Sequence, residues 1–400
     1  MLSDHKLALF LAQKSITKGN KGTLGLTIFI MSLVFVNSVF VSSLFLGLTN
    51  TINDQIINTV YGTVVIEPKK DEKFIDDVYS LKQKISRVPG VKGVSAQYIM
   101  GSVMSYKDKS GAWSVYSINP DDEITVTTTH NFIIDGEYLS KLDENDILLG
   151  KEIAGGYGGD DESRSLGGVK TGDSIDVLFN NGIKRTYRVK GIFGVNFQRS
   201  DNIAYISQKE MTSVTGMEDK ASQILIRTED VGNEGQFIKQ FLELGINEKI
   251  KPWQDYASMV KEITQSFDII SMLISGIGLF VAGVTIFIII YMNTISKRRQ
   301  IGISRAVGIK ESVIINSYFI QALFIVMSGI IMGLLIVFYI VAPWFIAHPL
   351  DFPMGSVSLL ILPESVFINA TSLIIAALAA GLIPSMMAVR ETIIESMWGD

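Results

Sequence analysis

Four long apolar segments constrain the fold of this chain more than any other feature. They cover residues 23–48, 267–294, 313–342 and 365–389. Each is long enough to cross a bilayer as a helix, which takes about 20 consecutive apolar residues. These segments are much richer in hydrophobic residues than the chain as a whole, of which hydrophobic residues make up 48%. We therefore expect an α-helical membrane protein with four transmembrane helices.

The charges between the apolar segments predict the orientation. Residues 1–22 carry four lysines against one aspartate, and the loop at 295–312 carries five Lys or Arg against one glutamate. The loop at 343–364 has no Lys or Arg. Because short cytoplasmic loops are rich in Lys and Arg, we expect both termini, with the tail at 390–400, inside the cell. Residues 49–266 and 343–364 then lie outside a multi-pass cell membrane protein.

The N-terminal region has two further features. The first apolar segment is too long for a signal peptide and lacks an A-x-A cleavage site, so we expect it to remain as a helix. Before it, residues 1–22 space Leu7, Phe10, Leu11 and Lys14 as in an amphipathic helix on the inner leaflet. A frayed extension of the first span is an equally supported alternative.

The external segment at 49–266 alternates strand and helix patterns. A helical pattern at 74–87 ends at Pro89-Gly90, and Asn180-Asn181-Gly182 is a hairpin signal. Strand patterns dominate between about 121 and 200 and alternate with helices elsewhere, so we expect a large α/β extracytoplasmic domain whose α/β lobe is split by a β-rich insertion. The strand patterns cover residues 61–67, 94–104, 113–118, 174–179, 183–192, 203–206, 224–227 and 249–253.

Two shorter segments flank this pattern. The Gly- and Asp-rich stretch at 155–162 indicates a flexible, solvated loop, with cation binding as the less favoured alternative. Residues 255–266 are expected to form a helix that continues into the second span.

Several functional classes lack the residues they need. Gly150-Lys151 is followed by Glu152, and no phosphate-binding G-x-x-x-x-G-K-[ST] loop occurs. The sequence has no G-x-S-x-G, no H-E-x-x-H, no cysteine and three scattered histidines. We therefore predict that the chain is not itself an enzyme and holds no cofactor or metal. The spans lack a central charge, which disfavours an ion-coupled carrier, and the net charge of −5 disfavours nucleic acid.

The most specific signal is K-R-R-Q-I-G-I-S-R-A-V-G at residues 297–308. It resembles the K-R-x-E-I-G-I-L-R-A-x-G signature of the FtsX/MacB/LolC-type (mechanotransmission, type VII) ABC transporter permeases, with Gln300 replacing Glu and Ser304 replacing Leu. In that family this loop forms a coupling helix that docks in a groove of a separate ATPase. An ordinary positive-inside loop is the alternative. The resemblance predicts these ATPase-coupling residues: Lys297, Arg298, Arg299, Ile301, Gly302, Arg305, Ala306, Val307 and Gly308. Four apolar residues are expected to form one compact face: Ile301, Ile303, Ala306 and Val307.

The resemblance extends along most of the chain. Residues 85–94, ISRVPGVKGV, are similar to the opening of the family's MacB-like periplasmic core domain. Residues 148–154 and 168–175 resemble segments of the lipoprotein-releasing LolC/LolE branch, and residues 384–390 resemble the family's C-terminal ending.

The resemblance also implies a function and partners. The chain would be a permease subunit beside a cytoplasmic ABC ATPase dimer, which binds ATP and Mg, and a second permease chain, identical or related. Its motion would extract a lipoprotein or other amphiphile from the outer leaflet, with an external lipoprotein or accessory protein as a further partner. Peptide or drug efflux and an FtsX-like regulator of cell-wall hydrolases stay open as alternatives. A receptor without an ATPase is disfavoured by the loop signature.

Overall fold

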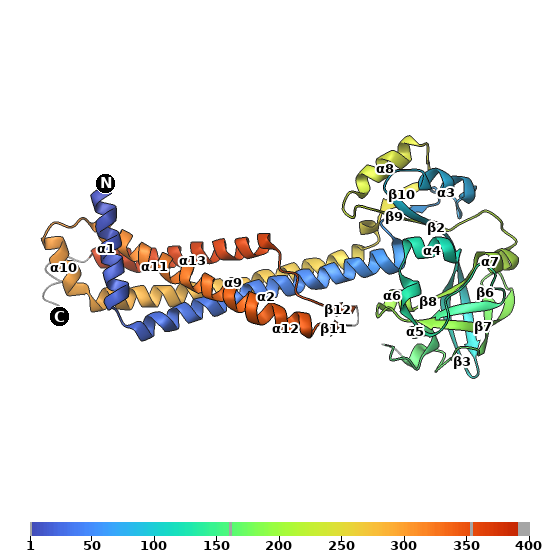
Figure 1. The fold of residues 1–400 in the computed structure, drawn as a ribbon, viewed down its shortest axis with the longest axis horizontal. Helices are drawn as coiled ribbons and strands as arrows, with labels where there is room; N and C mark the ends of the chain where they lie inside the picture. Colours follow the sequence, from blue (N-terminus) through green and yellow to red (C-terminus); the bar gives the residue numbers. More distant parts are fainter. Residues whose placement is uncertain (1, 160–161, 353–354, 391–400) are drawn as a thin grey trace. The chain divides into compact units, whose positions relative to one another are not determined.

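The chain divides into two compact units in the computed structural model (Figure 1). The helical unit consists of Met1–Leu48, Ile263–Leu350 and Val357–Asp400, and the α/β unit consists of Thr49–Glu262 and Asp351–Ser356. The structure describes residues 2–159, 162–352 and 355–390.

Four helical segments are long and apolar enough to cross a membrane, which confirms the predicted four-helix fold. They are Lys21–Tyr61, Thr264–Ser296, Glu311–Ala347 and Pro363–Met387, with mean hydropathies between 2.2 and 2.7. The helices that form or enter the helical unit are α1 (Leu2–Lys18), α2 (Lys21–Ile56), α9 (Ser258–Ser296), α10 (Arg298–Ala306), α11 (Glu311–Ile336), η5 (Val337–Val341), α12 (Ala342–Ala347) and α13 (Pro363–Arg390).

Small residues allow α2 and α11 to pack closely. A Cβ added at Gly329 would lie 2.5 Å from the Cβ of Met31, and one added at Gly333 would lie 2.7 Å from Phe35 Cδ1. Membrane helices approach one another in this way because lipid supplies no hydrophobic force between them. The spacing Gly-x-x-x-Gly therefore places two flat positions of α11 against α2.

Uncharged polar side chains add hydrogen bonds between the spans. Ser38 Oγ on α2 donates to Asn369 Oδ1 on α13 at 2.7 Å and lies 3.4 Å from Ser275 Oγ on α9. Such bonds are retained in hydrocarbon because an unpaired polar group there is costly. The network joins three of the four spans.

The α/β unit contains a four-stranded antiparallel sheet in the order β10-β1-β9-β2. Helices α3 and α8 pack on this sheet through a core that includes Ile85, Phe237 and Phe241 (Figure 1). The elements of the unit, in chain order, are η1 (Ile57–Tyr61), β1 (Val64–Glu67), α3 (Val78–Ser86), β2 (Val91–Tyr106), β3 (Lys109–Ile118), α4 (Pro120–Val126), η2 (Thr129–Phe132), β4 (Ile133–Gly136), β5 (Asp146–Gly150), α5 (Lys151–Ala154), η3 (Glu162–Arg164), β6 (Ser174–Phe179), β7 (Lys184–Phe193), α6 (Gln198–Asp201), β8 (Ile203–Ser207), α7 (Gln208–Thr215), β9 (Gln223–Thr228), α8 (Glu234–Glu243), β10 (Lys249–Pro252) and η4 (Trp253–Asp255).

The β-rich part closes on itself. Strands β2, β3, β8, β5, β7 and β6 each pair with the next, and β6 pairs back with β2. The interior of this ring is filled by fully buried side chains such as Met104, Val115 and Tyr187. The long strand β2 serves both parts, because residues 91–97 pair with β9 and residues 98–106 pair with β3. The predicted β-rich part within an α/β domain is thus present.

Some local predictions differ from the structure. The helix expected from residue 74 begins at Val78, because Ile75 instead pairs with Ala221 and Asp77 has a left-handed φ of 52°. The loop expected at 343–364 contains α12 and a two-stranded sheet, β11 (Leu350–Phe352) and β12 (Gly355–Val357). These strands have three residues each, which is too short for an alternation pattern to be recognised in the sequence.

Candidate functional site

The basic loop between the second and third spans forms the helix α10. Lys297 precedes its first residue, and Val307 caps its end. Gly308 has a φ of +96°, and its N–H donates to the Arg305 carbonyl at 3.0 Å. Glycine ends helices in this way because it adopts a left-handed φ without a Cβ clash. A short helix with a defined stop therefore stands where the signature occurs.

One face of α10 is held by the helical unit. Arg298, Ile301, Gly302 and Arg305 follow the i, i+3, i+4, i+7 spacing of a single helical face, and all four are buried or half-buried. Ile301 is only 8% exposed and belongs to the core cluster of this unit. Arg305 Nη2 donates to Glu311 Oε1 at 2.5 Å. These contacts fix the inner side of the helix.

The other face is open. Arg299, Ile303, Ala306 and Val307 again share one helical face, and all four are exposed. Val307 is 79% exposed and Ile303 is 46% exposed. The sequence-based expectation that Ile301 joins this apolar face is wrong, because it lies two positions from Ile303 and thus roughly 200° around the helix. The exposed set is a basic side chain beside three small or branched apolar ones.

Polar contacts tie the residues before and after α10 to helix α1. Lys297 Nζ donates to Ser15 Oγ at 2.5 Å, and Ser15 Oγ donates to Gln321 Oε1 on α11 at 2.9 Å. Lys310 Nζ lies 3.0 Å from Asp4 Oδ2, and this lysine holds the pKa of Asp4 below its usual value. Sequence reasoning missed Ser15 and Gln321, because no local pattern links residues about 300 positions apart.

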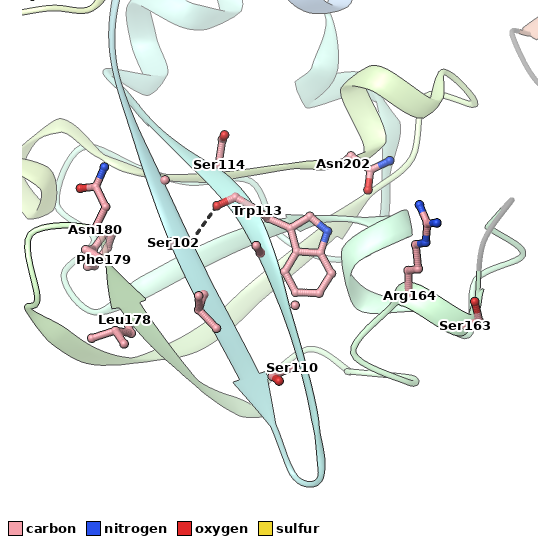
Figure 2. Close-up of a pocket in the computed structure, with 14 residues that line it drawn as sticks. Ser102, Ser110, Trp113, Ser114, Ser163, Arg164, Leu178, Phe179, Asn180 and Asn202 are labelled. Carbon is pink, nitrogen blue, oxygen red and sulfur yellow. Dashed lines mark hydrogen bonds between the residues drawn. The ribbon is translucent and has the colours of Figure 1, made fainter.

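The α/β unit carries a second candidate region, an open groove of about 1060 Å³ on the ring of strands (Figure 2). Val103 and Leu178 lie opposite each other in the β2–β6 register and are 43% and 44% exposed. Trp113 also lines the groove, and its ring occupies the space that a side chain at Gly111 would need, 2.3 Å from the Cβ position. The polar residues of the lining include Ser102, Ser110, Ser114, Ser163, Arg164, Asn180 and Asn202.

The same unit buries a carboxyl group near a lysine. Asp201 is fully buried, and its Oδ1 accepts a hydrogen bond from the Val195 N–H at 2.8 Å. Lys151 Nζ lies 4.0 Å from Asp201 Oδ2 and donates to Asn196 Oδ1 at 2.8 Å. Burial raises the pKa of Asp201 to about 6. The pair is thus a buried titratable feature of the α/β unit.

Comparisons with known proteins agree with this architecture. The model for a MacB-like periplasmic core domain matches residues 24–244, and the model for an FtsX-like permease C-terminal region matches residues 272–393. An uncharacterised ABC transporter permease from Methanocaldococcus jannaschii is 23% identical over 305 residues, which are 74% of this chain and 73% of that protein.

Two solved structures are also similar. The extracellular domain of the noncanonic ABC-type transporter YknZ from Gram-positive bacteria has 14% identity and a TM-score of 0.35, over 48% of this chain and 98% of that chain. The periplasmic region of MacB from Actinobacillus actinomycetemcomitans has 13% identity and a TM-score of 0.38, over 52% of this chain and 96% of that chain.

Proposed function

We propose that this chain couples a separate ATPase to movement of its extracytoplasmic domain. The chain belongs to the MacB/FtsX-type family of ABC transporter permeases. As a permease it is a membrane subunit, and the family implies association with a cytoplasmic ATPase. ATP binding and hydrolysis then occur on the partner, and this chain transmits the resulting motion.

The observation that carries the coupling role is the division of α10 into two faces. Ile301 and Gly302 are buried in the helical unit, while Ile303 and Val307 are exposed. An exposed branched side chain beside a basic one suits a groove on a partner protein, where apolar anchors supply most of the binding energy. One face of α10 packs into the helical unit and the opposite face would bind the ATPase. Motion of the ATPase would therefore move the helical unit.

Co-purification tests this role. The double variant Ile303→Asp with Val307→Asp places two charges on the exposed face without touching the buried one. We expect it to reduce co-purification of a co-expressed ATPase of this family by at least about tenfold, since each buried unpaired charge costs several kcal/mol. Leu142→Asp, at an 84% exposed position of the α/β unit, is the matched control. Unchanged co-purification of the double variant would contradict the docking role.

The proposed orientation places α10 and both termini in the cytoplasm and the α/β unit outside. The chain has no cysteine, so single cysteines introduced at Ile303 and Leu142 report accessibility directly. An impermeant maleimide should label position 142 on intact cells and position 303 only after permeabilisation. Equal labelling of both positions on intact cells would overturn the orientation.

We further propose that the substrate is an amphiphile, with a lipoprotein as the first choice. The support is the groove on the strand ring, whose lining includes the exposed Val103 and Leu178 together with the polar Asn180 and Arg164. Such a mixed lining suits a molecule with apolar and polar parts. A photoreactive residue at position 103 should capture a lipidated species, and that species should stimulate ATP hydrolysis by the reconstituted complex.

Other outcomes of this experiment identify the alternatives. Capture of a peptide or drug would assign efflux, and capture of a cell-wall hydrolase without stimulated substrate movement would assign the regulatory role. A second permease chain, identical or related, completes the proposed assembly, and mass measurement of the purified complex tests it.

A further inference from the structure

A pocket of about 420 Å³ lies between α1, α10 and α11 in the helical unit. Three lysines line it, namely Lys14 and Lys18 from α1 and Lys297 from the residue before α10. Among the described residues, the lining contains no Asp or Glu. The charged residues of the lining are thus all basic, which favours an anion.

Lys297 is the lysine of this pocket with the clearest capacity to bind an anion. Its Nζ donates to Ser15 Oγ at 2.5 Å, which leaves donors unused because an ammonium group has three. Burial lowers the pKa of Lys297, and no carboxylate among the described residues acts against that effect. A cation shielded from water is costly unless an anion compensates it. The pocket therefore has the charge and the free donors for an anionic ligand.

The remaining lining is both polar and apolar. Gln300 and Ser304 of α10 contribute an amide and a hydroxyl group, while Leu11 and Ile314 contribute hydrocarbon. A phosphate group can use the amide and ammonium donors together, whereas the Ser304 hydroxyl already donates to the Gln300 carbonyl at 2.8 Å. Hydrocarbon beside those donors suits a ligand that carries an apolar part as well.

The place of the pocket in the chain points to a lipid. The second apolar span ends at Ser296, one residue before Lys297. On α1, Leu9 and Phe10 are each 57% exposed, and the same helix carries Lys14 and Lys18. Exposed apolar residues beside lysines are typical of helices that lie at the membrane interface. Phospholipid headgroups occupy that level of the bilayer.

We propose that this pocket binds the phosphate-bearing headgroup of an anionic phospholipid, with Lys14, Lys18 and Lys297 as its cationic contacts. The inference does not depend on the coupling role, because the lining excludes Ile303 and Val307. A bound headgroup joins α1 to the start of α10. The lipid is thus a structural ligand of this chain and separate from any transported substrate.

Lipid retention by the full-length protein tests the proposal. The protein is reconstituted in nanodiscs of phosphatidylcholine with and without phosphatidylglycerol, and retained lipid is measured by native mass spectrometry. The double variant Lys14→Gln with Lys297→Gln should lose affinity for phosphatidylglycerol by about tenfold, since it removes two charge-assisted contacts. Lys6→Gln with Lys21→Gln makes the same charge change at exposed lysines outside the pocket and should retain the lipid within about twofold. Equal losses in the two pairs would overturn the proposal.

Two further measurements cover the other outcomes. In the wild-type protein, phosphatidylglycerol should slow acylation of Lys297 relative to Lys6 and Lys21, which requires no variant to fold. Equal rates with and without this lipid would refute the site. Inorganic phosphate added to phosphatidylcholine nanodiscs should leave acylation of Lys297 unchanged. Protection by phosphate alone would assign the pocket to a soluble anion and overturn the lipid assignment.

Discussion

Asp201 should make the stability of the α/β unit fall as the pH rises. Its pKa is 3.8 in an unfolded chain and about 6 in the folded protein, because burial disfavours the charged form. The folded state therefore binds this proton more tightly, by about 3 kcal/mol at roughly 1.4 kcal/mol per pH unit. The stability that protonated Asp201 contributes is therefore fully present below pH 3.8 and is lost as the pH rises to about 6.

The perturbation that isolates this effect is Asp201→Asn. The amide oxygen can still accept the hydrogen bond from the Val195 N–H, and Lys151 keeps its bond to Asn196. The wild-type free energy of unfolding, minus that of the variant, should fall by up to about 3 kcal/mol between pH 3.8 and about 6. The contribution of any other buried carboxyl cancels in this difference.

Urea unfolding of the full-length protein in detergent measures the difference. The fluorescence of Trp113 and Trp253 reports on the α/β unit in a Trp344→Phe, Trp398→Phe background. Asp176→Asn is the control for the sign of the effect, because the hydrogen bond from Lys184 lowers the pKa of Asp176. Its effect should appear only below pH 3.8 and run in the opposite direction. A difference for Asp201→Asn that is flat or rises with pH would refute the reasoning.

Two glycine substitutions give further predictions. Gly329→Ala should lower the thermal midpoint of the detergent-solubilised protein at a cost of about 1–3 kcal/mol, because its Cβ would lie 2.5 Å from Met31. Gly25→Ala, with no atom within 4 Å, should be neutral, and equal shifts would contradict the close packing. Gly111→Val should shift the emission of Trp113 by displacing its ring, whereas Gly101→Val, whose Cβ meets only Asn180 at 3.8 Å, should not. Unchanged emission for Gly111→Val would contradict the described ring position.

Much of the fold follows from local sequence patterns. The apolar spans are long enough to be recognised by length alone, and the hairpin between β6 and β7 turns at Asn180-Asn181-Gly182, where Gly182 has a φ of 85°. The closed ring of strands could not be predicted in the same way. It depends on parallel pairing of β3 with β8 and of β5 with β7, which joins segments separated by long stretches of chain. No local signal specifies such partners.

The candidate site shows the same division. The signature at residues 297–308 locates α10, but matching a consensus does not say which side chains face out. Helical periodicity separates Ile301 from Ile303, and only the burial of Ile301 in the core cluster that includes Ile314 and Tyr318 shows that it is the inner one. The contacts of Lys297 with Ser15 likewise depend on the tertiary placement of α1.

These contacts make α1 part of the proposed coupling element. A partner bound to Ile303 and Val307 would move α10. That movement would be transmitted to α1 through the contacts of Lys297 with Ser15 and of Lys310 with Asp4. Both contacts end on α1, so we expect α1 to move with α10 as one body. Helix α11 joins them through Gln321, which accepts from Ser15 at 2.9 Å. Because these bonds occur on the inner side and the flanks of α10, the exposed face can bind a partner without breaking the contacts that would transmit its motion.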